Sequence, residues 1–197
     1  MNASSMNVDL DQERLRKHLG PELYRHSLGV AETALELAER YGADKRRAYL
    51  AGLVHDYAKN LSAERLLALA SHFGLPIDRI TRAEPRLLHA PVGAALLPLE
   101  MKITDTAVLN AIACHTTGSS RMSLLARIVY LADVIEPSRD YPGVERLRQE
   151  AFQDLTGALL AAVENTIGSV LARGLLLHPR SVSFRNQLLL EKRMIGG

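Results

Sequence analysis

The sequence of 197 residues contains a single cysteine, Cys114, and no tryptophan. One cysteine excludes both a disulfide framework within the chain and a zinc site built from thiolates, and it fits a reducing compartment. We therefore expect a cytoplasmic protein. Aromatic residues make up only 5% of the chain, whereas alanine and leucine are abundant and no segment shows a strand-like alternation. This composition favours helices over a sheet.

Long basic runs and long apolar runs are also missing. The 24 Lys and Arg residues nearly balance the 22 Asp and Glu residues, for a formal net charge of +2. Without a basic run to follow a phosphate backbone, the expected partner is a small anion rather than a nucleic-acid polymer. No apolar stretch approaches the ~18 residues of a membrane span, and residues 1–10 do not resemble a signal peptide, so we expect no membrane partner. The length suits one domain over residues 1–197.

Glycine, proline and capping residues divide the chain into predicted helices. A long helical pattern near the C-terminus is expected to break at Asp154 or Gly157. The last helix is expected to pack through Val182, Leu188 and Leu189. After a lead over residues 1–8, the predicted helices cover about residues 9–19, 21–41, 45–60, 62–73, 78–82, 89–99, 106–115, 123–136, 144–173 and 181–194.

One predicted helix carries three polar side chains, His55, Asp56 and Lys59, in an otherwise apolar segment. A buried His–Asp pair is costly unless each member is hydrogen-bonded, ion-paired or bound to a cation, so this segment requires a partner. Gly52 lies one turn before His55 and would let another helix approach closely. Such an approach is what bringing His26 towards His55 requires.

Histidine and aspartate recur in several other predicted helices, near helix ends or beside apolar faces. Imidazole and carboxylate donors without sulfur suit iron, manganese, nickel, cobalt or zinc better than calcium or magnesium. A single histidine in an apolar helix is more often a hydrogen-bonded core residue than a ligand, and we assign that role to His18 and His72. The candidate metal ligands are His26, His55, Asp56, His89, His115 and Asp133.

Four motifs in a fixed order carry a resemblance to a known family. The order His26, then His55 with Asp56, then Asp133 resembles the HD-domain metal-dependent phosphohydrolases. The fuller motifs are similar to the YqeK family of symmetrical diadenosine tetraphosphate hydrolases, and the similarity covers about residues 10–190. The motifs are RHSLGV (25–30), AGLVHDYAK (51–59), HTTG (115–118) and YLADVIEPSR (130–139).

The resemblance implies an all-α fold, a single compact HD-domain helical bundle over residues 1–197. Residues of about 20–140 would form the metal-site core, and residues 141–197 would form C-terminal helices that pack on it. The resemblance also implies a homodimer and a mononuclear or dinuclear site for a divalent transition metal. Iron is the first choice, with manganese, nickel, cobalt or zinc as alternatives.

The resemblance further implies how the ligands divide between two ions. His26, His55, Asp56 and Asp133 would hold the first metal, and His89 with His115 would hold a second metal bridged by Asp56. If only one ion binds, His89 and His115 would contact phosphate or its water instead.

The implied reaction is hydrolysis of diadenosine tetraphosphate, or a related dinucleoside polyphosphate, to two ADP by metal-bound hydroxide. Nucleotides of the ADP and GDP type are therefore expected partners. Asp56 and Lys59 are the predicted catalytic residues, because Lys59 follows Asp56 by three positions and reaches the same side of a helix. Guanidinium binds phosphate bidentately, and Arg139 is the first choice among the arginines. The predicted substrate-binding residues are Arg25, Lys59, Thr116, Gly118, Arg127 and Arg139.

Three alternatives stay open at this point. The same site can serve a different substrate, such as a deoxynucleoside triphosphate, a nucleoside monophosphate or a cyclic dinucleotide, although the motifs after His115 argue against this. The protein can be a sensor that binds metal or nucleotide without turnover. It can also be a helical interaction domain whose histidines belong to the core.

Overall fold

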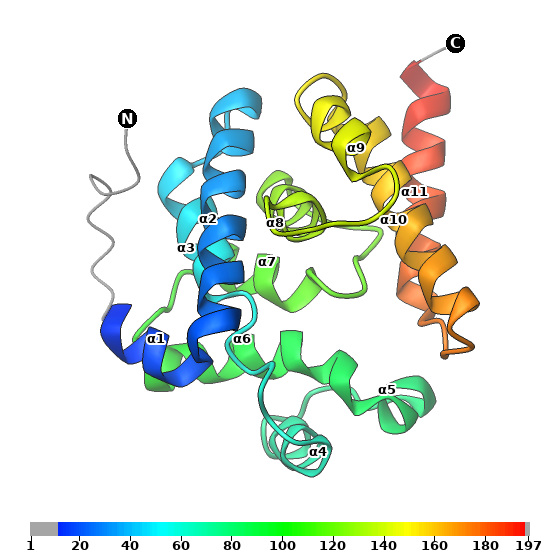
Figure 1. Ribbon diagram of the computed structural model, residues 1–197. Coiled ribbons are helices and arrows are strands. Elements are labelled where there is room, and N and C mark those ends of the chain that lie inside the picture. The colour runs from blue at the N-terminus through cyan, green and yellow to red at the C-terminus, as the bar shows by residue number, and fades with distance from the viewer. Residues whose placement is uncertain (1–11, 196–197) are drawn as a thin grey trace.

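The computed structural model describes residues 12–195, and within that range every regular element is helical (Figure 1). The all-α prediction is therefore confirmed. The predicted lead over residues 1–8 and the predicted helix start near residue 9 lie outside the described residues. In chain order the helices are α1 (Gln12–Leu19), α2 (Pro21–Tyr41), α3 (Lys45–Val54), α4 (Ala63–His72), α5 (Arg79–Ala83), the short helix η2 (Pro85–Leu88), α6 (His89–Glu100), α7 (Thr106–Cys114), α8 (Leu124–Ile135), α9 (Val144–Ala151), α10 (Leu155–Ala172) and α11 (Pro179–Ile195).

Side-chain caps begin most of these helices where the sequence predicts a start. Asp44, Ser62 and Ser123 each accept a hydrogen bond from the backbone amide three residues later. Asp105 accepts from two amides at the start of α7. Each such cap stabilises a helix by about 1 kcal/mol. At the other end of α2, Gly42 adopts a φ of 72°, which ends the helix in the left-handed conformation that glycine tolerates.

The helix predicted over residues 45–60 is shorter than expected, because α3 ends at Val54. The amides of Tyr57 and Lys59 bond to carbonyls only three residues back, at 3.1 and 2.9 Å. This tighter pattern is typical of turns that follow an α-helix. His55 and Asp56 consequently lie at the end of the helix, where their side chains can face a cluster rather than a helix surface.

Helices α2 and α3 pack at very short range. An alanine Cβ at Gly52 would lie 2.7 Å from Ala31 Cα and 3.0 Å from the carbonyl carbon of Val30. Ala31 and Val30, the residues on the α2 side of this contact, are fully buried. The prediction that Gly52 lets the His26 helix approach is confirmed by this geometry.

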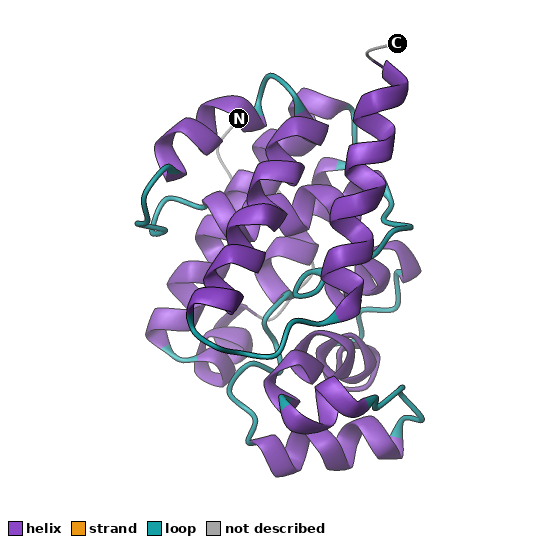
Figure 2. Ribbon diagram, turned by 90° about the vertical axis from the view of Figure 1, so that its right-hand side faces the viewer, coloured by secondary structure: helices purple, strands orange, loops and turns teal. Residues whose placement is uncertain are grey.

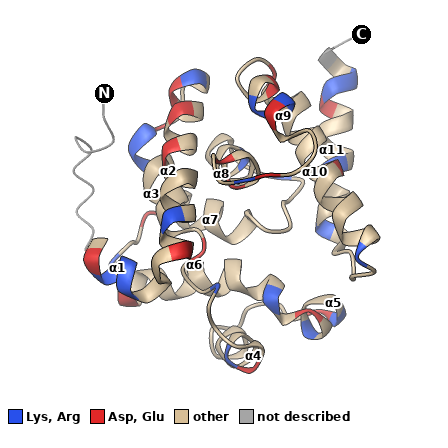
Figure 3. Ribbon diagram, in the orientation of Figure 1, with Lys and Arg blue, Asp and Glu red and all other residues tan. Residues whose placement is uncertain are grey.

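The apolar helix α8 lies between the α2–α3 pair and the C-terminal helices, and it contacts α2, α3 and α7 as well as α9 and α10 (Figure 1). Figure 2 shows the same bundle from the side, with short loops joining its helices. Helices α1, α2 and α9 carry both acidic and basic residues, whereas α7 has no charged residue (Figure 3).

The C-terminal helices break and pack largely as predicted. Asp154 caps α10 by accepting from the amide of Gly157 at 2.9 Å, so the predicted break is confirmed. In α11, Phe184 and Leu188 are buried, but Val182 is 39% exposed. The prediction that Val182 packs inward was wrong, because the buried residues of α11 are Ser181, Phe184 and Leu188 at helical spacing, and Val182 lies off that face. We retain the prediction of a single domain over residues 1–197.

Helix α10 departs from the expectation about apolar runs. Over Leu155–Ala172 it is long and apolar enough, by length and composition alone, to cross a membrane. This is weak evidence of a span, because a core helix of a soluble bundle satisfies the same criterion. Here α10 packs against α8, α9 and α11.

Candidate metal centre

The ends of several helices bring the six predicted ligands into one cluster. His26 lies on α2, and His89 begins α6. His55 and His115 directly follow α3 and α7, and Asp56 comes one residue after His55. Asp133 comes from the last turn of α8. Potential ligand atoms in the cluster fall within 4.8 Å of one another in three overlapping groups. These are His26, His55 and Asp56; His55, His115 and Asp133; and Asp56, His89 and His115.

The Asp56 carboxylate lies at the centre of the cluster and is almost fully buried, with 1% of the residue exposed. Its Oδ2 atom lies 3.3 Å from His55 Nε2 and 3.7 Å from His26 Nε2. Its Oδ1 atom lies 3.1 Å from His89 Nε2 and 3.4 Å from His115 Nε2. The two oxygens therefore face two different pairs of imidazoles, which is the arrangement of a carboxylate that can bridge two ions.

Asp133 completes the first of these groups. Its Oδ1 atom lies 3.1 Å from His26 Nε2 and 3.8 Å from His55 Nε2. One side of Asp56 thus has two imidazoles and a second carboxylate, whereas the other side has two imidazoles.

Each of the four imidazoles has an oxygen acceptor at its Nδ1 atom. An oxygen at this position keeps the proton on Nδ1, so the lone pair of Nε2 points into the cluster. For His26 the acceptor is the Glu136 carboxylate, at 3.0 Å from Oε1. The other three use a backbone carbonyl three residues earlier: His55 with Gly52 O at 2.7 Å, His89 with Arg86 O at 2.6 Å, and His115 with Ile112 O at 2.8 Å.

The converging Nε2 atoms lack enough donors among the described residues. The Nε2 atoms of His26 and His55 are buried and make no hydrogen bond. Those of His89 and His115 lie 3.0 Å apart, and both are 3.2 Å from the Thr116 hydroxyl, whose single proton can satisfy only one of them. Buried lone pairs and carboxylates facing one another are costly without a cation. The donor set therefore fits divalent metal ions.

The electrostatics of the cluster agree with this fit. Burial alone would raise the pKa of Asp56, but the adjacent imidazoles of His55 and His115 hold it well below its usual range. Burial likewise opposes ionisation of Asp133, yet the nearby His26 and His55 imidazoles and the Arg139 guanidinium keep its pKa low. Burial lowers the pKa of His115 to about 4. Ionised carboxylates and a neutral imidazole are the forms that bind metal.

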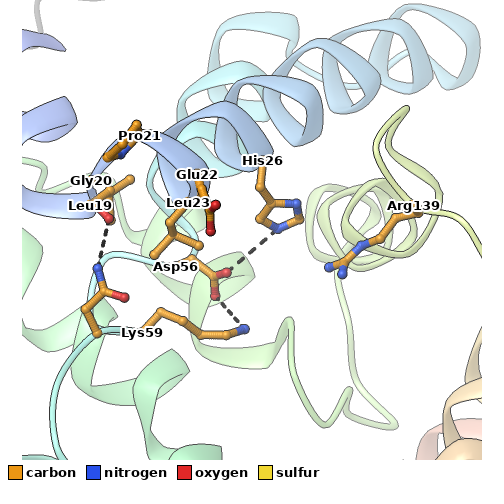
Figure 4. Close-up of a pocket in the computed structure, with 10 residues that line it drawn as sticks. Leu19, Gly20, Pro21, Glu22, Leu23, His26, Asp56, Lys59 and Arg139 are labelled. Atoms are coloured by element: carbon orange, nitrogen blue, oxygen red, sulfur yellow. Dashed lines mark hydrogen bonds and ion pairs between the residues drawn. The ribbon is translucent and has the colours of Figure 1, made fainter.

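A cleft of about 600 Å³ opens beside the cluster, and His26 and Asp56 form part of its lining (Figure 4). Lys59 Nζ lies 3.2 Å from Asp56 Oδ1. Arg139 donates from Nη2 to Asp133 Oδ1 at 2.5 Å and from Nε to the Asp133 carbonyl at 2.8 Å. Both cationic side chains extend into the cleft in Figure 4. The cleft therefore combines a candidate metal cluster with two positive charges.

Comparison with known proteins identifies this arrangement. Residues 23–138 match the HD domain, a range that contains all six ligands. The chain belongs to the HD-domain family.

Relatives match the HD domain and the helices beyond it. The symmetrical bis(5'-nucleosyl)-tetraphosphatase of Halalkalibacterium halodurans is 42% identical over 188 residues, which cover 95% of this chain and 100% of the relative. The Bacillus subtilis protein of the same name is 40% identical over 153 residues, 78% of this chain and 82% of the relative. A solved structure from Clostridium acetobutylicum, described as a predicted HD superfamily hydrolase involved in NAD metabolism, has a TM-score of 0.88 and 42% identity. It covers 91% of this chain and 95% of that one.

The predicted substrate-binding residues lie at different distances from the HD centre. Thr116 touches two of the imidazoles, as described above, whereas Arg25 is exposed on α2 next to His26. Arg127 forms a bidentate ion pair with Glu191 of α11, at 2.7 and 2.8 Å. Its guanidinium therefore serves the packing of α8 against α11, and we do not carry it into the proposed substrate contacts.

Gly118 has a structural reason to be glycine. Its φ is 66°, and a Cβ there would collide with the Phe184 ring. The turn after α7 and the packing of α11 thus account for this residue.

Several expectations for histidine and tyrosine change. His18 and His72 are exposed rather than part of the core. His18 bonds to the Tyr57 carbonyl at 2.7 Å and stacks on the Tyr57 ring with centroids 4.1 Å apart. Tyr57 is buried and donates its hydroxyl to Glu100. Its ring is therefore covered and is not available to stack on a base. Tyr141 donates its hydroxyl to the Val134 carbonyl.

The sequence did not single out Glu136, which contacts His26 and is 1% exposed. The available signal was a carboxylate at the end of an apolar helix, three residues after Asp133. The apolar side of the cleft was also not predicted from the sequence. It is lined by Leu19, Pro21 and Leu23, and the polar Asn60 lies in the same cleft.

Proposed function

We propose that the protein hydrolyses diadenosine tetraphosphate symmetrically, with one water, to two ADP. The observation that carries this proposal is the position of Asp56, whose two oxygens face two separate pairs of imidazoles. The relatives from Halalkalibacterium halodurans and Bacillus subtilis, which match most of the chain, are symmetrical bis(5'-nucleosyl)-tetraphosphatases. An HD centre of this kind supports metal-dependent phosphate hydrolysis.

Different residues of the chain would bind the metal ions and the phosphates. Divalent ions held by the six ligands would polarise phosphate oxygens and lower the pKa of water from 15.7 to about 7. Lys59 and Arg139 stand at the cleft and neutralise the tetraphosphate, and Arg139 offers a planar fork for two phosphate oxygens. No side-chain nucleophile is required. The P–O bond that breaks joins one of the two central phosphorus atoms to their bridging oxygen, so each product keeps two phosphates.

The cleft has the size and chemistry that a nucleotide requires. Its volume of about 600 Å³ lies within the range of roughly 300–1,000 Å³ for small-molecule sites. Leu19, Pro21 and Leu23 give it an apolar wall, while Lys59 and Arg139 supply positive charge. A nucleoside can lie against the wall while its phosphates reach the cluster.

Product analysis tests the proposal directly. Metal-loaded protein is incubated with diadenosine tetraphosphate, and the nucleotides are separated by ion-exchange chromatography. ADP as the sole product supports the proposal, whereas AMP with ATP, or no turnover, refutes it. Asp56→Asn should abolish the reaction. Asp78→Asn is a matched control, because Asp78 is a carboxylate that pairs with His178 outside the cluster, at 3.0 Å.

We also propose that the metal is iron, that the protein acts in the cytoplasm and that it forms a homodimer. Imidazole and carboxylate ligands without sulfur support a borderline divalent metal. Exposed leucines near the end of α10, Leu171 at 61% and Leu176 at 46%, offer apolar surface for pairing. Anaerobic purification with metal quantification tests the first point, and light scattering tests the oligomeric state. Binding of ADP and of GDP can be compared in the same preparation.

A further inference from the structure

Glu136 is a buried carboxylate directly behind a metal-ligand candidate. It follows the last residue of α8 and is 1% exposed. Its Oε1 atom accepts from His26 Nδ1 at 3.0 Å and from the Ser138 hydroxyl at 2.5 Å. Its Oε2 atom accepts from the Ser138 amide at 2.8 Å, and Arg139 Nε lies 3.8 Å from Oε1. The carboxylate is therefore held by several donors in one orientation.

This contact distinguishes His26 from the other three imidazoles of the cluster. They donate Nδ1–H to neutral backbone carbonyls, whereas His26 donates to a carboxylate. Hydrogen bonds to an ionised acceptor are about twice as strong as neutral ones. A carboxylate behind a histidine ligand fixes its tautomer and ring orientation and raises its basicity.

The neighbouring helix leaves room for this carboxylate. A Cβ at Gly29 of α2 would lie 2.6 Å from Glu136 Oε2. Glycine in a helix interior weakens the helix relative to alanine, so its presence there calls for a reason. The space needed by Glu136 supplies one.

We propose that Glu136 is a positioning residue that fixes the Nδ1–H tautomer of His26 and thereby sets the affinity of the His26, His55 and Asp133 group for metal. Gly29 is the second part of this device, because it admits the carboxylate to its place behind His26. The inference rests on the metal site of the proposed function but not on the identity of the substrate.

Glu136→Gln tests the role of the charge. The amide oxygen can replace only one carboxylate oxygen. If the NH₂ group faces His26, it forces the proton onto Nε2 and blocks ligation; if it faces the Ser138 amide, two donors oppose each other. We expect the Mn²⁺ dissociation constant of the group that contains His26, measured by equilibrium dialysis, to rise about 10–100-fold. Unchanged Mn²⁺ binding in Glu136→Gln would overturn the inference.

Gly29→Ala tests the same device without changing a polar group. Its Cβ should displace the carboxylate and weaken Mn²⁺ binding in the same direction as Glu136→Gln. In a Glu136→Ala background the atom that clashes is gone, and Glu136 Cβ at 3.6 Å is an ordinary contact. Gly29→Ala should then have no further effect on affinity, whereas additive losses would contradict the coupling. Gly168→Ala is the matched control, since nothing lies within 4 Å of a Cβ there.

Nitrogen-15 NMR of the metal-free protein gives a readout that a purely structural role would not change. The His26 ring, assigned by comparison with His26→Gln, should be in the Nδ1–H form in the wild type and should shift towards Nε2–H in Glu136→Ala, which removes the acceptor at Nδ1. Retention of the Nδ1–H form in Glu136→Ala would overturn the tautomer assignment. A folded wild-type protein that binds no Mn²⁺ would overturn this inference together with the metal site. Normal binding without turnover would contradict only the proposed function.

Discussion

Gly52→Ala examines whether the close contact of α2 and α3 sets the geometry of the metal centre. The new Cβ would lie 2.7 Å from Ala31 Cα, which is 0.7 Å short of the 3.4 Å at which ordinary contact begins. It would also lie 2.9 Å from Ala31 N and 3.0 Å from the Val30 carbonyl carbon. These are backbone atoms, so no side chain can rotate away. The two helices must therefore separate by about 0.7 Å at this point.

The cost follows from this displacement. Overpacking a well-packed core costs about 1–3 kcal/mol, and alanine returns about 1 kcal/mol through its higher helix propensity. Because backbone must move, we expect a net loss of about 2 kcal/mol, which lowers the Tm by about 4–8 °C for a chain of this length. Helix α2 carries His26, and α3 leads into His55 and Asp56. A misplacement approaching 1 Å at a catalytic group costs about 100-fold in rate.

Two assays separate these effects: thermal unfolding by circular dichroism, and steady-state hydrolysis of diadenosine tetraphosphate at saturating metal, well below the Tm of the variant. Gly168→Ala is again the control, because α10 has open space at that residue. It should leave kcat unchanged and the Tm equal or higher. If Gly52→Ala has the same Tm as the wild type and a kcat within twofold of the wild-type value, the reasoning about close approach is refuted.

Four further outcomes are expected. His55→Ala should retain less metal than the wild type on purification, as measured by plasma mass spectrometry, and equal content would contradict the site. Arg139→Ala should lower kcat/KM about 10–100-fold, since a lost charged hydrogen bond costs about 1.5–3 kcal/mol; a change below threefold in steady-state assays would remove it from the substrate contacts. Arg127→Ala should leave kcat/KM within twofold and lower the unfolding free energy in urea by up to about 1 kcal/mol, because it loses only the Glu191 pair. Metal-free protein should lose stability between pH 6.5 and 4, because burial holds the pKa of His115 at about 4 while the unfolded chain binds that proton near 6.5; urea titrations of His115→Gln should show a shallower slope.

Local signals in the sequence account for much of the fold and most of the cluster. Capping residues such as Asp44 and Ser123 place helix starts because they act within three residues of the chain. Small residues mark close helix contacts, as at Gly52. The six candidate ligands were predictable because polar side chains in apolar helices need partners, and the resemblance supplied their order. Their convergence on Asp56 then follows from the packing of α2, α3, α6, α7 and α8.

Contacts between distant parts of the chain were not predictable in this way. Arg127 has the right charge for phosphate, but its partner Glu191 comes from α11, 64 residues away. Val182 fits an apolar pattern, yet the register of α11 is set by Phe184 and leaves it exposed. In the sequence Glu136 is a charged residue at a helix end. Only the folded structure shows that it contacts His26 Nδ1, 110 residues away along the chain. Each of these cases depends on tertiary packing that no local pattern encodes.

The packing that assembles the cluster also couples metal binding to the stability of the folded chain. Apolar burial of residues such as Val30 and Val54 holds the helices in place whether or not a cation is present. The same packing forces four Nε2 lone pairs and two carboxylates together, which raises the free energy of the metal-free state. A ligand that binds only the folded chain stabilises it by about 2.7 kcal/mol at a free concentration 100 times its dissociation constant. Metal binding therefore offsets a cost that the core has already imposed, and any variant that loosens the core should weaken metal affinity less than a variant that reorients His26.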